Sequence, residues 1–291
     1  MSNFDKTMKL YNRKFSDNEV KNELEKIKTK SEENKNKEIY KTCFNCIDLT
    51  SLNHTDSEES IAKLTQKVNN FEDQFPEMPS VAAMCVYPSM VKTVKETLTE
   101  DIGIASVSGG FPSSQTFIEV KIAETAMCVL EGATEIDVVI SIGKFLSGDY
   151  ESVAEEISEI KASCRGAHLK TIIESGSLQS IDNIYKASII SMIAESDFIK
   201  TSTGKTEPAA TPEAAYAMCY AIKDFYEKTG KKIGFKAAGG IATPEEAVYY
   251  YSIVEEILGK EWLNNELFRI GASRLSNHLL SSIYEKEIKY F

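Results

Sequence analysis

The 291-residue sequence has no apolar run that approaches the ~18 consecutive residues needed to cross a membrane. Its first six residues contain no apolar core of the kind found in secretion signals. Positive charge is also scarce, since 33 Lys and Arg face 44 Asp and Glu and the net charge is −11. A nucleic-acid binder needs a basic face. We therefore expect a cytoplasmic protein that binds neither membranes nor nucleic acid.

Recognisable metal and redox motifs are missing as well. His54, His168 and His278 are isolated from one another and show no metal-ligand spacing. The six cysteines lie mostly in apolar runs, as free buried thiols do. Cys43 and Cys46 have the C-x-x-C spacing, but no second pair completes a zinc site, and we expect this stretch to be a strand whose residues three apart point to opposite faces. The sequence thus predicts no metal site.

The chain does contain a regular alternation of short apolar runs and helical patterns from residue 42 onward. Apolar runs without polar alternation are typical of parallel strands buried on both faces. Eight such units in order predict a (β/α)8 barrel, the TIM-barrel fold, over residues 42–291. A doubly wound open sheet is the alternative, but the glycine-rich loop that it predicts after its first strand is missing. The expected strands are Cys43–Ile47, Ala82–Val86, Gly103–Val107, Ile136–Ile140, Leu169–Ile173, Asp197–Lys200, Ile233–Lys236 and Leu267–Ile270.

Residues 1–41 are rich in Lys, Glu and Asn and are expected to precede the barrel as a charged extension. Val20, Leu24 and Ile27 form a thin helical stripe, so we expect one or two helices, with a mobile segment over Ser31–Lys37. The favoured interpretation is a solvated and partly disordered extension. A lid over the barrel floor or an oligomer contact is the alternative.

Two lysines stand at the carboxyl ends of predicted buried strands, where barrel enzymes have their active sites. Lys200 lies in the stretch DFIKTSTGK and Lys236 in GFKAAGG. Lysine is almost never fully buried unless it is paired or functional. Two lysines at this end suggest amine chemistry, in which one forms a Schiff base and the other lowers the pKa of the first.

The expected interaction between these lysines is large. Two ammonium groups about 4 Å apart repel by roughly 4 kcal/mol at an effective dielectric near 20, which takes a lysine from a pKa of roughly 10.4 toward neutrality. Lys200, beside apolar residues, is the better nucleophile, and Lys236 then remains the cation. Asp137, within EIDVV, needs a cationic partner if it points inward. We expect it to relay protons with Lys236; a structural ion pair is the alternative.

A phosphate site is suggested by glycines at the ends of three successive strands. Glycine lets backbone N–H groups approach an anion closely, and the loops after strands 7 and 8 commonly hold phosphate in barrels. The residues concerned are Gly204, Lys205, Gly239, Gly240, Gly271 and Ser273.

Taken together, these motifs resemble the deoxyribose-phosphate aldolase family. The similarity also includes IDLT at 47–50, MCVYP at 84–88 and RIGAS at 269–273, and it covers roughly residues 43–282 in order. The resemblance implies a metal-free, cofactor-free class I aldolase of (β/α)8 fold. Such an enzyme reversibly cleaves 2-deoxy-D-ribose 5-phosphate into acetaldehyde and D-glyceraldehyde 3-phosphate in deoxyribonucleotide catabolism.

By the same resemblance, Lys200 forms the imine, and Asp137 and Lys236 perturb it and shuttle protons. Positions matched to substrate contacts are Asp48, Thr50, Cys85, Thr203 and Lys205, and Cys85 is expected near the site mouth, open to alkylation by unsaturated aldehydes. Positions matched to the phosphate cradle are Gly239, Gly240, Gly271 and Ser273.

The sequence departs from the family at three places. Arg274 stands where many members have a second serine, and it either binds phosphate bidentately or faces solvent. Tyr290 is followed by Phe291, whereas some members end in a tyrosine that assists proton transfer. The stretch SGGFP at 108–112 is unexpectedly rich in glycine and has no assigned role.

Two other functions remain open at this point. One is a different Schiff-base barrel aldolase or transaldolase, and the other is a non-catalytic phosphosugar-binding barrel. The sequence does not fix the oligomeric state; a homodimer is among the states that it allows.

Overall fold

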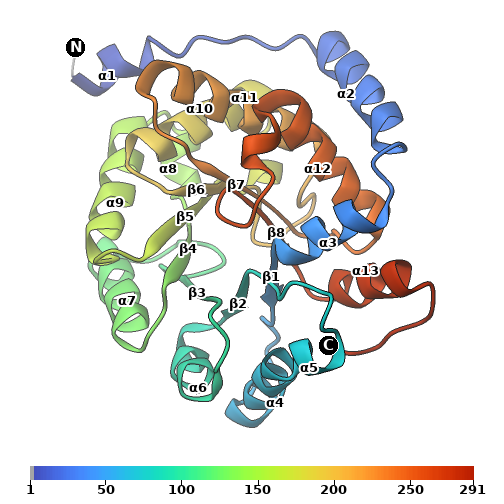
Figure 1. Ribbon diagram of the computed structural model, residues 1–291. Helices are drawn as coiled ribbons and strands as arrows, with labels where there is room; N and C mark the ends of the chain where they lie inside the picture. The colour runs from blue at the N-terminus through green and yellow to red at the C-terminus, as the bar shows by residue number, and fades with distance from the viewer. Residues whose placement is uncertain (1–2) are drawn as a thin grey trace.

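A computed structural model describes residues 3–291 and contains eight parallel strands that close into a barrel in chain order (Figure 1). Each strand pairs with the next, and β8 pairs with β1. The predicted (β/α)8 fold is confirmed. The strands are β1 (Ile47–Thr50), β2 (Ala83–Val86), β3 (Gly103–Ser108), β4 (Glu135–Val139), β5 (His168–Ile172), β6 (Phe198–Lys200), β7 (Gly234–Ala238) and β8 (Phe268–Ala272).

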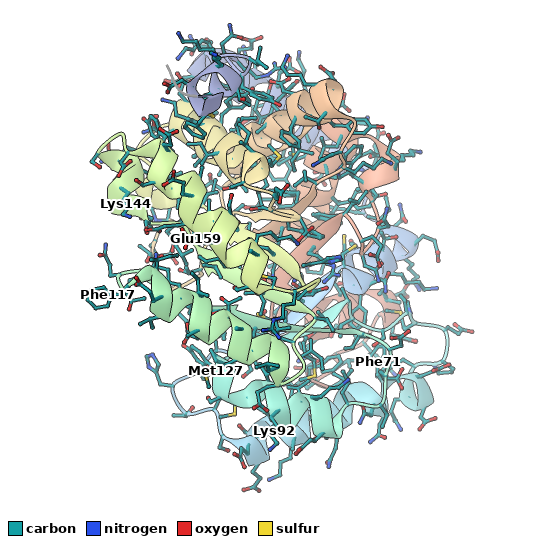
Figure 2. All side chains as sticks on the ribbon, turned by 90° about the vertical axis from the view of Figure 1, so that its left-hand side faces the viewer. Phe71, Lys92, Phe117, Met127, Lys144 and Glu159 are labelled. Carbon is teal, nitrogen blue, oxygen red and sulfur yellow. The ribbon has the colours of Figure 1, made fainter. Side chains whose placement is uncertain are left out.

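Helices surround the barrel, and Figure 2 shows several of them side by side along one wall. Every helix within residues 3–291 is too short or too polar to cross a bilayer. The helices after the first strand are α4 (Glu58–Asn69), α5 (Phe71–Gln74), α6 (Val91–Thr97), α7 (Ile118–Leu130), α8 (Ile142–Leu146), α9 (Tyr150–Ser163), α10 (Ile181–Ile193), α11 (Pro212–Thr229), α12 (Pro244–Leu258) and α13 (Leu275–Tyr284).

The start of the barrel differs from the prediction. The expected strand Cys43–Ile47 is wrong, because residues 43–45 form the last turn of α3 (Lys37–Asn45) and β1 begins only at Ile47. Asn36 caps this helix by accepting a hydrogen bond from the Ile39 backbone N–H at 3.1 Å. The apolar residues that suggested a strand are instead the buried face of the helix, where Phe44 stacks on Phe71 with ring centroids 5.1 Å apart.

The N-terminal extension contains α1 (Asn3–Met8) and α2 (Asp17–Ser31). The predicted stripe of Val20, Leu24 and Ile27 is buried, and α2 contacts α11 and α12 on the barrel wall (Figure 1). The extension is therefore packed on the outside of the barrel rather than solvated.

Polar contacts hold the extension at two further points. Arg13 donates two hydrogen bonds to the Asp224 carboxylate of α11, at 2.8 and 2.6 Å. In the segment that we expected to be mobile, the Asn34 side chain donates to Ser252 and Glu255 of α12. Helix α3 runs across residue 42, and the domain boundary at that residue stays a prediction.

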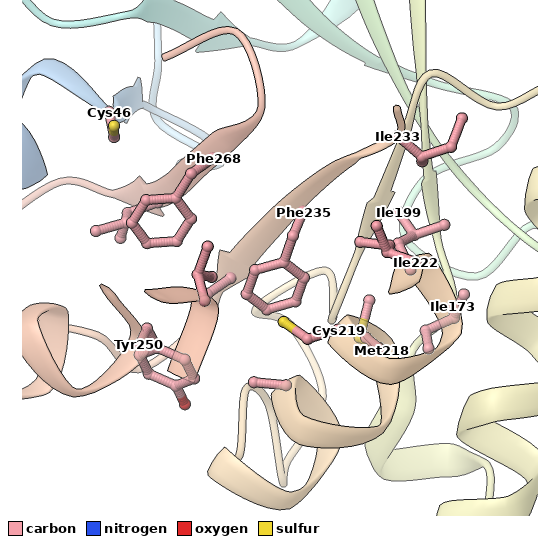
Figure 3. Packing of buried hydrophobic residues seen from close by; sticks show 14 of the residues in the cluster. Cys46, Ile173, Ile199, Met218, Cys219, Ile222, Ile233, Phe235, Tyr250 and Phe268 are labelled. Carbon is pink, nitrogen blue, oxygen red and sulfur yellow. The ribbon is translucent and has the colours of Figure 1, made fainter. Parts of the chain in front are cut away.

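Alternation along the strands separates an apolar outer layer from a charged interior. Phe235 of β7 and Phe268 of β8 stack with ring centroids 6.3 Å apart, next to buried residues such as Cys219 of α11 (Figure 3). The following residues, Lys236 and Arg269, are register partners in adjacent strands. Because successive side chains of a strand point to opposite faces, these two enter the barrel.

Candidate active site

Seven charged side chains converge inside the barrel, and each is at most 5 % exposed. They come from six of the eight strands. Burying a charge is costly unless it is paired and hydrogen-bonded, and here carboxylates and cations alternate. The seven are Asp48, Glu135, Asp137, Lys170, Lys200, Lys236 and Arg269, called the charged column below.

The upper part of the charged column joins the three residues in which the sequence predicted catalysis. Lys200 and Lys236 are register partners on β6 and β7. Both Nζ atoms donate to the same oxygen, Oδ2 of Asp137, at 2.8 Å each. Lys236 also donates to Asp48. The expected carboxylate–diamine cluster is therefore present in the geometry.

The protonation tendencies of the upper part follow from its pairing. Burial alone raises the pKa of Asp137, but Lys200, Lys236 and Lys170 outweigh it and hold that pKa below its usual value. Burial lowers the pKa of Lys236, but Asp137 and Asp48 outweigh it and raise that pKa. Asp137 is thus an anion and Lys236 a cation at neutral pH.

The lower part of the charged column is made by residues that sequence reasoning missed. Arg269 donates to Asp48 Oδ1 at 2.6 Å and to Glu135 Oε1 at 2.9 Å. Lys170 donates to Asp48 Oδ2 at 3.1 Å and also to Glu135. A signal was present in the sequence, because Glu135, Lys170 and Arg269 are charged residues that adjoin apolar residues of β4, β5 and β8.

A cavity of about 220 Å³ lies at the carboxyl ends of the strands, and Lys200 is the member of the charged column that lines it. The cavity gathers most of the predicted substrate and phosphate positions. Those that line it are Thr50, Thr203, Gly204, Lys205, Gly239, Gly240, Gly271 and Ser273, joined by Arg274.

The cavity wall depends on two glycines. Gly239 has φ +91°, and a Cβ there would lie 2.6 Å from Ala209 Cβ and 3.0 Å from Gly204 Cα. Gly204 has φ +72°. The loops after β6 and β7 therefore touch backbone to backbone, an approach that a larger residue would prevent.

Two buried or partly buried contacts fix the loop after β6. Glu174, in the left-handed region at φ 49°, accepts hydrogen bonds from Thr203 N at 3.2 Å and Thr203 Oγ1 at 2.6 Å. Lys205 Nζ donates to the Leu52 carbonyl at 2.6 Å, which joins this loop to the one after β1. The sequence predicted no role for Glu174. We infer from these two hydrogen bonds that Glu174 orients Thr203.

Three sequence-predicted positions lie elsewhere. Asp48 and Cys85 are fully buried below the cavity and are not part of its lining. Burial raises the pKa of the Cys85 thiol, which disfavours the reactive thiolate. Tyr290 lies on the outside of the barrel, where its hydroxyl donates to the Lys67 carbonyl at 2.7 Å and its ring packs on Phe75.

A family model described as DeoC/LacD family aldolase matches residues 42–250 of this chain. The chain belongs to the DeoC/LacD family of aldolases. Within this family it is 44% identical over 253 residues to the deoxyribose-phosphate aldolase of Bos taurus, covering 82% of this chain and 79% of the relative. It is also 44% identical over 252 residues to that of Homo sapiens, covering 82% and 78%.

Solved structures agree with this assignment. The deoxyribose phosphate aldolase of Aeropyrum pernix, described as a unique tetramer, superposes with a TM-score of 0.67 at 25% identity. The superposition covers 88% of this chain and 96% of that one. This chain is therefore a lyase built on the same barrel.

Proposed function

We propose that this chain reversibly cleaves 2-deoxy-D-ribose 5-phosphate into acetaldehyde and D-glyceraldehyde 3-phosphate through a Schiff base on Lys200, as a step of deoxyribonucleotide catabolism. One observation carries the proposal. Lys200 lines the cavity, while Asp137 and Lys236 lie directly behind its amine. The names of the relatives support the substrate.

The charges that surround Lys200 balance one another. The charged column holds three carboxylates and, besides Lys200, three cations, so it is neutral without a fourth positive charge. An uncharged amine is what attack on an aldehyde requires.

The reaction can be written with these groups. The lone pair of Lys200 Nζ attacks C1 of the open-chain sugar, and the resulting carbinolamine takes up one proton and loses water to give the protonated imine. A base removes the proton of the C3 hydroxyl, the C2–C3 bond breaks, and its electron pair forms an enamine as D-glyceraldehyde 3-phosphate leaves. Protonation at C2 and hydrolysis then release acetaldehyde and the free amine.

Asp137 and Lys236 are the groups proposed to move these protons. Oδ1 of Asp137 has no hydrogen-bond donor among residues 3–291, although Lys170 Nζ lies 3.5 Å away. That oxygen therefore keeps the capacity to accept a further hydrogen bond or a proton.

The phosphate is proposed to bind at the glycine loops. Backbone N–H groups of Gly239 and Gly240 and the first turn of α13 favour an anion. Lys205 and Arg274 add positive charge to the same cavity. A cytoplasmic location is proposed because all six cysteines are free thiols, as in a reducing compartment.

Reductive trapping tests the imine. The protein is incubated with acetaldehyde and borohydride, digested and examined by mass spectrometry, and we expect an ethyl group on Lys200. Lys205, which lines the same cavity, serves as the internal control and should stay unmodified. An ethyl group on Lys205 alone, or turnover without any trapped lysine, would remove Lys200 from its role.

The alternatives give different results in a second assay. A non-catalytic phosphosugar-binding barrel would show no retro-aldol turnover of 2-deoxy-D-ribose 5-phosphate. In a transaldolase-like enzyme, borohydride would trap an imine of that enzyme's own donor but no imine of acetaldehyde. The proposal expects turnover that persists in the presence of a chelator.

A further inference from the structure

Glu174 is a buried carboxylate that lies outside the charged column and has no part in the proposed reaction. The residue is 2 % exposed. None of the ion pairs among residues 3–291 includes it. Its hydrogen bonds come from the backbone N–H and the hydroxyl of Thr203. Because a buried carboxylate without a cation is costly, these two hydrogen bonds need an explanation.

The backbone of Glu174 is strained and is held on both sides. Its φ of 49° and ψ of 61° lie in the left-handed region, which residues other than glycine rarely adopt. Before it, Ile173 N donates to the Lys200 carbonyl at 3.0 Å. After it, Ser175 N donates to the Thr201 carbonyl at 2.8 Å. Strain that the surroundings fix in this way is concentrated at functional sites.

The side-chain contacts set the direction of the Thr203 hydroxyl. An ionised carboxylate only accepts, so the hydroxyl hydrogen of Thr203 points to Glu174 Oε2, 2.6 Å away. The backbone N–H of Lys205 donates to the same hydroxyl oxygen at 3.1 Å and uses one of its two lone pairs. Thr203 lines the cavity. It can therefore accept a hydrogen bond from a substrate there, but it has no proton to donate.

The place of Thr203 in the cavity indicates which substrate group donates to it. In the proposed reaction, on which this inference rests, C1 of the sugar is joined to Lys200 and the phosphate on C5 lies at the glycine loops. Thr203 lies between these points, because it directly precedes Gly204, whose backbone approaches Gly239. The C3 hydroxyl gives its proton to the base. The C4 hydroxyl is the donor that remains.

We propose that Glu174 is a positioning residue that makes the site selective for substrates with a hydroxyl group at C4. It acts through Thr203, which it holds with one lone pair toward the sugar. A site built to bond a hydroxyl discriminates against an analogue without it, because a polar atom of the site then lacks its partner. Without the carboxylate, the Thr203 side chain can rotate and this discrimination weakens.

The experiment measures kcat/KM for retro-aldol cleavage of 2-deoxy-D-ribose 5-phosphate and of its analogue without the C4 hydroxyl. The ratio of the two values is the hydroxyl preference. Each variant's hydroxyl preference is compared with that of the native protein. A general loss of activity or of folded protein then cancels, and so does the inability of the analogue to form a five-membered ring.

Two variants should lower the hydroxyl preference. Glu174→Met keeps the length of the side chain, but its thioether is only a weak acceptor, and we expect a decrease of about tenfold. Glu174→Asp keeps the charge but is one methylene shorter and does not reach Thr203. It should cause a similar decrease, although a role of the charge alone would predict none.

Two other variants should keep the hydroxyl preference. In Glu174→Gln the amide accepts from Thr203 N and donates to Thr203 Oγ1, and a substrate hydroxyl can accept as well as donate. The preference should stay within about twofold of the native value. Glu195→Met is the matched control, because Glu195 is also left-handed, with φ 69°, but is exposed and lies outside the cavity lining.

A double variant tests whether Glu174 acts through Thr203. Thr203→Val has nearly the same shape without the hydroxyl and should lower the hydroxyl preference by about tenfold. In the Thr203→Val background, Glu174→Met should lower the preference no further. Independent residues would instead give multiplied losses, about a hundredfold in all, and that result would overturn the inference.

Failure of this inference can be told apart from failure of the proposed reaction. A native hydroxyl preference in Glu174→Met would overturn the inference and leave the reaction intact. A native protein that cleaves neither compound would overturn the reaction and the inference with it. Should Glu174→Met fail to fold by circular dichroism, Glu174→Asp and Glu174→Gln decide, and equal preferences in these two would refute the positioning role.

Discussion

The upper and lower parts of the charged column contain the same kinds of groups but are paired differently. In the lower part, Arg269 and Lys170 each reach two carboxylates, and no member lines the cavity. In the upper part, Lys200 has one carboxylate oxygen at 2.8 Å and an open side toward the cavity. Full pairing makes the lower part a structural element, whereas incomplete pairing leaves the upper amine available to a substrate.

Burial alone does not distinguish the proposed nucleophile from the other two lysines of the charged column. Lys170 and Lys236 are less exposed than Lys200. Their surroundings raise the pKa of both, because burial is outweighed by neighbouring carboxylates. A cation held in this way is a poor nucleophile but a good source of positive charge for a neighbour. The amine with fewer partners and an open cavity is the better nucleophile.

Removal of the upper amine should have the largest effect. Lys200→Met is expected to lower kcat for retro-aldol cleavage by at least about 10³-fold, a loss of about 4 kcal/mol in transition-state stabilisation. Asp137 keeps Lys236 as a partner, so the fold should survive. Steady-state kinetics measure the change in kcat, and circular dichroism shows whether the fold is retained. Lys205→Met, in the same cavity, should mainly raise KM; equal kcat losses in the two variants would contradict the distinction.

Removal of a lower cation should act on stability instead. Arg269→Met leaves Asp48 and Glu135 short of a buried partner, and we expect a loss of about 3–5 kcal/mol in the free energy of unfolding. Urea unfolding measures this. Lys289→Met breaks a fully exposed pair with Glu287 and should leave the midpoint unchanged. An Arg269→Met protein as stable as the native one would show that the lower part is not structural.

The column should also set the acid limit of the fold. Burial raises the pKa of Asp48, but Lys170, Lys236 and Arg269 outweigh it and hold that pKa well below its usual value. A depressed carboxyl pKa gives stability that is present above about pH 4, the unfolded value, and is lost as pH falls further. The urea midpoint of unfolding should therefore be lower below pH 4 than at pH 7.

A variant pair sharpens this pH test. Asp48→Asn should be less stable than the native protein at pH 7 and should lose less stability on acidification, because one depressed carboxyl is gone. Asp101→Asn, at an exposed position, should keep the native slope. If both variants retain the native pH dependence of the urea midpoint, Asp48 does not contribute to the loss of stability in acid.

The smallest effect is expected at the cavity rim. Arg274 is exposed and lines the cavity beside Ser273. Arg274→Gln should raise KM for 2-deoxy-D-ribose 5-phosphate by about tenfold, since one charge-assisted contact to phosphate is lost. KM for unphosphorylated deoxyribose should not change. Arg165→Gln, at an exposed arginine after α9, is the control; an Arg274→Gln protein with native KM would mean that this guanidinium faces solvent.

Much of this architecture could be predicted from the sequence, because apolar runs and helical patterns report directly on burial. The error at Cys43–Ile47 arose because a short apolar run fits a strand and one buried helix face equally well. The clustering of Lys200, Lys236 and Asp137 could be predicted because they stand out at strand ends or in a distinctive motif. Glu135, Lys170 and Arg269 could not be assigned partners, because their pairing crosses strands that lie far apart in the chain.

The pairing of seven ionisable groups across six strands limits which substitutions such a protein can accept during evolution. Replacement of a residue in the lower part leaves a buried neighbour without its partner, so change there requires several simultaneous substitutions. The loop residues around the cavity, such as Arg274, take no part in these buried ion pairs. Variation in the aldehydes accepted should accordingly accumulate in the loops around the mouth, while the barrel interior stays fixed, and attempts to redirect the enzyme in the laboratory should begin at the same loops.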